Sequence, residues 1–289
     1  MIAARRGFSA GILASVLAVP AAASDWFEPG DARLRSDLAS LVDAGWLDLP
    51  MLGWPIPRED VCDALTAGRA AGDAPPERLA AALGRLHQHC GLPSGARAYA
   101  TGGDPGLLHG FEAEPRADGV VGIAQSWRGT RAGARLELSL AANPDDDLPF
   151  RPDGSYAALD AANWRLSAGW LDRWWGPGWD GSLILSNNPR PLPGLALDRI
   201  RSTPFESRWL SWLGPWRATA FLGALENERT DVDRPLFLGL RVAARPLPGL
   251  EIALSRSAQF CGEGLPCSLS SFGDLLVGTN RLDEARVFL

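Results

Sequence analysis

The spacing of apolar residues changes near residue 96, and this change divides the chain into two predicted parts. In residues 31–90 apolar side chains recur every three or four positions, which is the spacing of one helix face. Asp31 can cap a first helix, Pro57 suits the first turn of a second, and a third runs from Pro75 to a stop at Gly91. The apolar positions are Leu34, Leu38, Leu41, Val42, Trp46, Val61, Cys62, Leu65, Leu79, Leu83 and Leu86. Residues 24–95 are therefore expected to form a small helical bundle, a plug too small to hold a large ligand pocket.

After residue 96 the spacing becomes two, the period of a β-strand with two different faces. Five runs alternate in this way: 135–140, 164–170, 216–222, 236–242 and 250–255. A soluble sandwich would use shorter strands with the apolar face against a protein core. A transmembrane barrel uses strands of about 9–11 residues with the apolar face toward lipid and aromatic residues at the interfaces. The lengths of the runs, and the Arg and Glu on their polar face, favour an all-β transmembrane barrel over residues 96–289.

The first 23 residues have the three-part pattern of a secretory signal peptide. Arg5 and Arg6 form the positive region, residues 7–19 the apolar core, and Ala21 to Ala23 the cleavage site. A membrane anchor is the alternative, but this core is short for spanning a bilayer. We therefore expect export, with cleavage after Ala23.

The charge balance of the chain argues against one class of partner. The sequence has 28 Lys and Arg against 34 Asp and Glu, and losing the two signal-peptide Arg changes the formal charge from −6 to −8. Nucleic-acid binders carry a basic footprint instead, so no nucleic-acid partner is expected.

Export places all four cysteines in an oxidising compartment, where disulfides persist. Local pairing, Cys62 with Cys90 and Cys261 with Cys267, is the preferred choice among three connectivities. A metal site at His87, His89 and Cys90 is the alternative. Residues two apart on a helix point to different sides, so that set has poor ligand geometry, and no metal or cofactor is expected.

Residues 163–194 carry the most distinctive motif of the chain. From Trp174 to Pro191 the sequence reads Trp-Trp-Gly-Pro-Gly-Trp-x-Gly-Ser-Leu-Ile-Leu-Ser-Asn-Asn-x-Arg-Pro. This segment resembles the capsule assembly Wzi family of outer-membrane proteins. Further stretches similar to that family are 45–46, 54–55, 153–156, 202–206, 209–216, 225–229, 245–251, 255–256 and 261–267.

The resemblance implies an outer-membrane β-barrel of about eighteen strands, within the even range of such barrels, with a helical bundle at its periplasmic side. It also implies a lectin-like, non-catalytic protein that attaches or helps to assemble capsular or exopolysaccharide at the cell surface. The expected partners are that polysaccharide, outer-membrane lipid and the polysaccharide export machinery. A porin-like solute channel and, with less support, an outer-membrane polysaccharide-modifying enzyme are the alternatives.

The sequence departs from the family in its number of strands. It holds about nine or ten strand-like runs and ends at Leu289, a non-aromatic residue, soon after the Cys261–Cys267 loop. An open half-barrel would leave unpaired strand edges in lipid, which is costly. We therefore expect the chain to be a fragment or the product of a truncated reading frame, or its strands to pair in another arrangement.

The candidate polysaccharide-binding residues lie in the same motif. Trp offers an apolar face to sugar rings, and the Arg fork suits acidic sugars. The predicted set is Asp172, Arg173, Trp174, Trp175, Trp179, Asn187, Asn188 and Arg190. The alternative is structural: interfacial Trp and Asn residues that cap turns. In an extended segment Trp174 and Trp175 point to opposite faces, so at most one of them is expected to face the lumen.

The other residues that could bind a metal or catalyse a reaction are better explained without such a role. Asp145 to Asp147 lack the alternate ligands of a calcium loop and are expected to form a solvated extracellular turn. Glu226 and Glu228 share a strand face, as a glycosidase pair could, but such spacing is common. Neither a Gly-x-Ser-x-Gly elbow nor a His-Glu-x-x-His motif is present in the sequence.

Overall fold

The computed structural model describes residues 24–70, 77–103, 110–112, 116–144, 146–225, 235–262, 267–268, 270, 273 and 286–288. Three sequence predictions lie outside these residues: the signal peptide 1–23, the Asp145 end of the acidic turn, and the Glu226 and Glu228 pair.

The three predicted helices are present at the expected places. They are α1 (Ala32–Asp43), α2 (Arg58–Ala70) and α3 (Glu77–Gly91). Asp31 caps α1 through its side-chain oxygen, which accepts a hydrogen bond from the Leu34 amide.

Helix α1 ends earlier than its apolar spacing suggests. Gly45 adopts a φ of 74°, and its amide donates to the Val42 carbonyl while the Trp46 amide donates to the Leu41 carbonyl. This pair of bonds is the glycine-terminated helix end known as the Schellman motif. Trp46 therefore follows α1 and packs against the core from outside the helix.

Two short strand pairs accompany the helices: one lies within the N-terminal part, and the other joins it to the second part of the chain. β1 (Trp26–Phe27) pairs with β3 (Ile56–Pro57), and β2 (Gly53–Trp54) pairs with β10 (Trp174–Trp175). The apolar faces of the helices meet in one cluster that also contains Phe111 and Trp174 from the second part of the chain. The helices and β1–β3 are called the plug below (residues 24–91). The plug thus shares its core with two segments that connect strands of the sheet.

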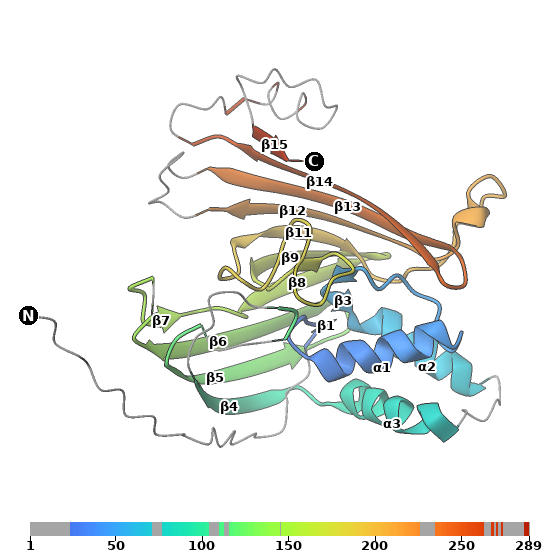
Figure 1. Ribbon diagram of the computed structural model, residues 1–289, viewed down its shortest axis with the longest axis horizontal. Coiled ribbons are helices and arrows are strands. Elements are labelled where there is room, and N and C mark those ends of the chain that lie inside the picture. Colours follow the sequence, from blue (N-terminus) through green and yellow to red (C-terminus); the bar gives the residue numbers. More distant parts are fainter. Residues whose placement is uncertain are drawn as a thin grey trace, which may run out of the picture.

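Residues 95–288 contribute an antiparallel sheet of eleven strands in the order β15-β14-β13-β12-β11-β9-β8-β6-β5-β4, with β7 paired to β6. The strands are β4 (Gly95–Gly102), β5 (Gly119–Arg128), β6 (Ala132–Ala142), β7 (Phe150–Arg151), β8 (Tyr156–Ala161), β9 (Trp164–Trp170), β11 (Pro193–Arg199), β12 (Trp216–Ala224), β13 (Leu236–Leu247), β14 (Leu250–Phe260) and β15 (Arg286–Phe288). Within the described residues the sheet is open, with β4 and β15 at its edges. It curves over the helices, which lie against its concave side at one end (Figure 1).

The two faces of the sheet confirm the predicted alternation. On β6, Leu136 and Leu140 are 51% and 56% exposed on the convex face, whereas Arg135, Glu137 and Ser139 are buried beneath the sheet. A soluble sheet buries its apolar face, so this distribution is inverted relative to a sandwich. It is the distribution expected of a wall with lipid outside and a polar lumen inside.

The connections at the two ends of the sheet differ in length. At the helix end, residues 129–131, 162–163 and 248–249 make short turns, and residues 200–215 are the exception. At the opposite end, long segments join the strands, among them 103–118 and 171–192. Along the described part of the chain, none of the helices combines the length and apolarity that crossing a bilayer requires.

Both predicted disulfides are confirmed. Cys62 and Cys90 join α2 to α3, and Cys261 and Cys267 close a short loop after β14. The disulfide at Cys90 removes it as a metal ligand, and the Nδ1 atom of His87 lies 2.8 Å from the Leu83 carbonyl oxygen.

Replacing both Cys62 and Cys90 with alanine is expected to lower the free energy of unfolding by about 3–4 kcal/mol, because a longer closed loop restricts the unfolded chain more. The Cys261–Cys267 pair spans 6 residues instead of 28, and its removal should cost about 2 kcal/mol. Urea unfolding of the two double variants in detergent measures the difference. Equal losses would contradict this ranking.

Candidate functional site

The segment between β9 and β11, residues 171–192, does not continue the wall of the sheet. It turns inward to the plug, where β10 pairs with β2: Trp174 lies opposite Trp54 and Trp175 opposite Gly53. The Trp175 amide also donates to the Leu185 carbonyl, and the Gly176 amide to the Leu52 carbonyl. The distinctive motif therefore lies in a long inward loop bonded to the N-terminal part of the chain.

Trp174 and Trp175 are buried, at 0% and 1% exposed. Trp174 packs edge-on against Phe111, and its indole N–H donates to the Gly178 carbonyl. Trp175 reaches the sheet, where its ring lies close to the space that a side chain at Gly239 would occupy. A ring without exposed surface cannot stack on a sugar, so for these two residues the predicted polysaccharide contact gives way to a packing role. With almost no exposed surface, neither ring is placed as an interfacial Trp would be.

Trp179 is the accessible Trp of the motif, at 44% exposed. The Arg35 guanidinium of α1 lies 4.2 Å from its ring centroid and 4.4 Å from that of Phe111. Arg35 also donates to the Pro177 and Gly178 carbonyls, each at 2.8 Å. Burial lowers the pKa of Arg35 to about 10, so it remains charged at neutral pH. One buried cation thus fixes both the 177–178 backbone and the orientation of the Trp179 ring.

Asp172 and Asn187 meet at a second arginine, Arg116. Its guanidinium donates to the Asp172 carboxylate at 2.9 Å and to the Asn187 carbonyl at 2.7 Å. The Asn187 side chain is buried and donates to the Phe111 carbonyl. Burial raises the pKa of Asp172, and Arg116 opposes this only in part. Asn187 is therefore a structural residue that joins two long loops, whereas the Asp172 side chain stays 32% exposed.

Arg190 lies at the centre of an ionic cluster at the long-loop end of the sheet. It forms a two-pronged pair with Asp153, at 2.9 and 2.7 Å, and bonds Asp146 at 2.9 Å. Arg151 donates to the same Asp146 carboxylate. The acidic turn is thus tied to the motif: Asp146 is exposed, as expected of a solvated turn, and also pairs with Arg151 and Arg190. Asn188 beside the cluster is exposed.

A cavity of about 240 Å³ adjoins Arg190 and is lined by both polar and apolar side chains. Arg173 lines it from within the protein, is buried, and lies over the Phe221 ring at 4.5 Å. Its Nη1 atom is 3.9 Å from the Asp198 carboxylate. Burial lowers the pKa of Arg173, with partial compensation from Asp198.

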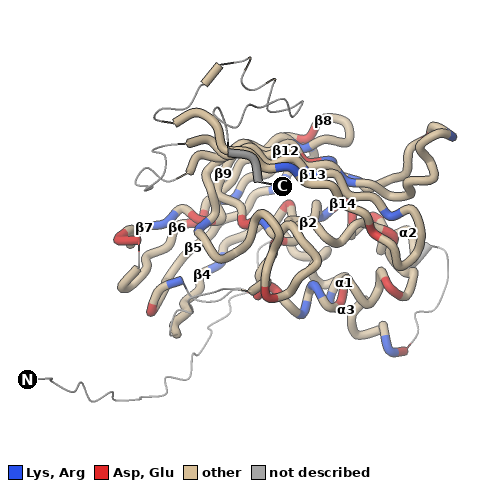
Figure 2. The backbone as a smooth tube through the Cα atoms, turned by 45° about the horizontal axis from the view of Figure 1, so that its top comes forward, with Lys and Arg blue, Asp and Glu red and all other residues tan. Residues whose placement is uncertain are grey.

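The plug is bonded to the concave face of the sheet by arginines, and Figure 2 colours the basic and acidic positions on both partners. All 28 basic residues of the sequence are Arg, and none is Lys. Among the described residues, guanidinium groups of the sheet meet plug carboxylates in five ion pairs: Arg128 with Asp25, Arg135 with Glu28, Arg165 with Glu59, Arg217 with Asp60, and Arg245 with Asp48. Arg suits such buried pairs because it binds carboxylates with two parallel bonds and is weakly hydrated.

Replacing Glu28 with glutamine is expected to destabilise the protein at neutral pH, because Arg135 is only 6% exposed and loses its closest carboxylate. Burial raises the pKa of Glu28, but the Arg135 guanidinium lowers it by more, so the pKa lies below its ordinary value of 4.5. A carboxyl group with a lowered pKa stabilises the fold at pH values above its ordinary pKa. This stabilisation is lost as the pH falls through the lowered pKa. Unfolding of wild type and Glu28→Gln should therefore differ at pH 7 and converge below pH 4.5. A difference that is constant with pH would contradict this.

Several residues that build the site give little signal in the sequence. Arg35 lies on a helix among apolar positions, while Phe111 and Arg116 lie between β4 and β5, far from the motif in the sequence. Asp153 falls in a stretch already noted for its resemblance. Among the residues described, no group of three His, Cys, Asp or Glu is arranged to hold a metal ion.

Comparison with known proteins gives consistent matches. The family model described as capsule assembly protein Wzi matches residues 102–288. An uncharacterised 55.8 kDa protein of the cps region of Klebsiella pneumoniae is 32% identical over 280 residues, which is 95% of this chain and 54% of that protein.

A solved structure agrees with the sequence matches. Wzi of Escherichia coli, described as an outer-membrane protein involved in group 1 capsule assembly and as a carbohydrate-binding β-barrel, superposes with a TM-score of 0.79 at 30% identity. The match covers 86% of this chain and 56% of that one. The chain thus spans about half the length of the relatives it matches. Because the family model covers more than half of its residues, this chain belongs to the family of the capsule assembly protein Wzi.

Proposed function

We propose that this protein lies in the outer membrane and holds capsular polysaccharide at the cell surface by binding it, without catalysing a reaction. The observation that carries the proposal is the extended likeness to the Escherichia coli protein described as a carbohydrate-binding β-barrel. The inverted sheet supports the membrane location, because exposed Leu136 and Leu140 have no protein partner on the convex face of the described residues.

The unequal connections support one orientation in the membrane. Outer-membrane barrels have short periplasmic turns and longer extracellular loops. The short turns lie at the helix end of the sheet and the long segments at the other. The plug then lies on the periplasmic side and the Arg190 cluster at the outward end, while Trp179 lies on the inward loop where that loop meets Arg35 of the plug.

The polymer contact is proposed for the accessible members of the motif. Trp179 offers a partly exposed ring held by Arg35, and Arg190, Asp172 and Asn188 supply polar groups from the same inward loop. Arginines paired only to surface carboxylates can exchange partners with acidic sugars. The plug, with its side chains against the concave face, favours this role over that of an open solute channel.

Replacing Trp179 with alanine is expected to weaken polysaccharide binding about tenfold, or about 1.4 kcal/mol, because a rigid aromatic contact is lost. The matched control is Trp127→Ala, since Trp127 is 52% exposed but lies on the convex face of β5, away from the long loops. The measurement is the amount of labelled capsular polymer bound by cells that carry equal amounts of each variant. Equal binding by both variants would contradict the assignment of Trp179.

A further inference from the structure

The connection between β11 and β12, residues 200–215, is the one long connection at the helix end among those described. Its base is fixed to the plug. Asp60 of α2 accepts hydrogen bonds from the Ser202 amide and hydroxyl, at 2.7 and 2.9 Å. Arg201 pairs with Asp63 one turn further along α2. The connection therefore leaves the sheet from a defined point.

The part of the connection that returns to β12 is fixed as well. Phe205 stacks on Trp216 at 4.4 Å, and Arg199 lies 3.9 Å from the centroid of the same ring. Gly214 has a φ of 65°, and a Cβ there would lie 2.0 Å from the Arg245 carbonyl oxygen of β13. Only glycine can make this approach. The tip of the connection is thus held between two fixed ends, against β13.

The tip carries large apolar side chains that no described residue covers. Trp209 is 77% exposed, Trp212 63% and Leu210 42%. Trp212 lies in the short 3₁₀ helix η1 (Ser211–Leu213), and Leu210 precedes it. The Arg208 guanidinium lies 5.3 Å from the Trp209 ring centroid. Soluble surfaces rarely gather two exposed Trp and a Leu within four residues.

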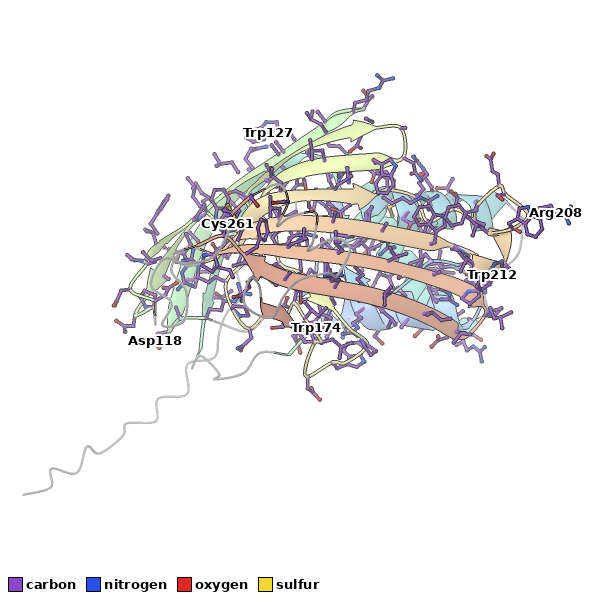
Figure 3. All side chains as sticks on the ribbon, turned by 90° about the horizontal axis from the view of Figure 1, so that it is seen from above. Asp118, Trp127, Trp174, Arg208, Trp212 and Cys261 are labelled. Carbon is purple, nitrogen blue, oxygen red and sulfur yellow. A yellow bond between two sulfur atoms is a disulfide. The ribbon has the colours of Figure 1, made fainter. Side chains whose placement is uncertain are left out.

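The tip continues the lipid-facing surface of the sheet. It projects past the strand ends on the convex side, away from the helices (Figure 1), and Figure 3 shows Arg208 and Trp212 at that end of the molecule. The neighbouring convex positions Leu247 and Ile252, of β13 and β14, are 61% and 55% exposed. Trp side chains concentrate where the hydrocarbon of a bilayer meets its headgroups, and a nearby Arg can reach the phosphates.

We propose that residues 208–212 form a lipid anchor that lies in the headgroup region of the periplasmic leaflet and fixes the depth of the wall and its plug in the outer membrane. This inference rests on the membrane location proposed above. It assigns to the tip a phospholipid surface rather than a partner protein. Because the base of the connection is bonded to α2, the anchor also couples the position of the plug to the membrane surface.

The anchor can be tested with a single added cysteine, since the four native cysteines form two disulfides. Full-length variants carrying Trp212→Cys, Leu254→Cys or Arg131→Cys are labelled with a polarity-sensitive fluorophore in isolated outer membranes. Lipids with a nitroxide at the headgroup or in mid-chain, and aqueous iodide, serve as quenchers. Leu254 is 78% exposed on the convex face, and Arg131 lies exposed in a short turn at the same end as the tip.

The label at position 212 should be quenched about twofold more by headgroup nitroxides than by mid-chain nitroxides or iodide, because interfacial Trp positions lie at headgroup depth. Quenching by iodide alone, as expected at position 131, would overturn the anchor. Protection from every quencher would also overturn it and indicate a covering protein. The label at position 254 tests the membrane location separately: mid-chain quenching there, with iodide quenching at 212, would reject only the anchor.

Discussion

Replacing Asp60 with alanine is expected to release α2 from the sheet and to lower the free energy of unfolding by about 3–5 kcal/mol, the usual cost of removing one partner from a buried ion pair. Asp60 is buried, bonds the Arg217 guanidinium at 2.8 Å and accepts two hydrogen bonds from Ser202. Its loss leaves the Arg217 side chain, 6% exposed, without a carboxylate. Urea unfolding in detergent, with protease digestion to detect plug release, measures the effect.

Asp63→Ala is the matched control for this experiment. Asp63 lies one turn along the same helix and pairs with Arg201 at 2.7 Å, but the two side chains are 56% and 46% exposed. Exposed pairs contribute about 0–1 kcal/mol, so this variant should unfold close to wild type. Similar losses in the two variants would show that burial of the Asp60 pair does not hold the plug.

Replacing Arg35 with alanine is expected to abolish most polysaccharide retention while the sheet remains folded. Arg35 bridges α1 to the Pro177 and Gly178 carbonyls and to the Trp179 ring. Hydrogen bonds from a charged group contribute about 1.5–3 kcal/mol each, so the inward loop loses its main attachment to α1. Polymer binding by cells, together with resistance of the sheet to urea, separates the two effects.

Arg33→Ala controls for the loss of a positive charge from α1, because Arg33 is exposed on the opposite side of the same helix turn. It should bind polymer as wild type does. The proposed link between plug and binding loop fails if Arg35→Ala retains full binding, or if Arg33→Ala loses as much.

The elements that depend on local sequence could be predicted from it. The cap of α1 and the apolar spacing of α1, α2 and α3 act within a few residues, and each disulfide joins the cysteines that are neighbours in the sequence. The strands β6, β9, β12, β13 and β14 contain the five alternating runs because charged residues face the plug there. β5 was less evident, since its inner positions are Gly122 and Ala124. Gly122 carries no side chain because the Tyr99 ring occupies the space that a Cβ there would need.

The site could be predicted only in part, because its geometry depends on contacts between distant segments. Nothing local to Trp174 indicates that its strand partner is Trp54, and a period-two interpretation places Trp174 and Trp175 on the two faces of a wall strand instead. Arg35, Phe111 and Arg116 become site residues only when the plug and two long loops meet. A residue's type indicated the chemistry of the motif, whereas burial decided which side chains remain available to a ligand.

The most direct test of the proposed function is the binding of purified capsular polysaccharide to capsule-free cells that carry this chain in their outer membrane. Cells with the wild-type chain should bind the polymer saturably, cells with Trp179→Ala should bind it about tenfold more weakly, and cells without the chain should not bind it. Equal binding with and without the chain, when fractionation recovers the folded chain from the outer membrane, would contradict the proposal.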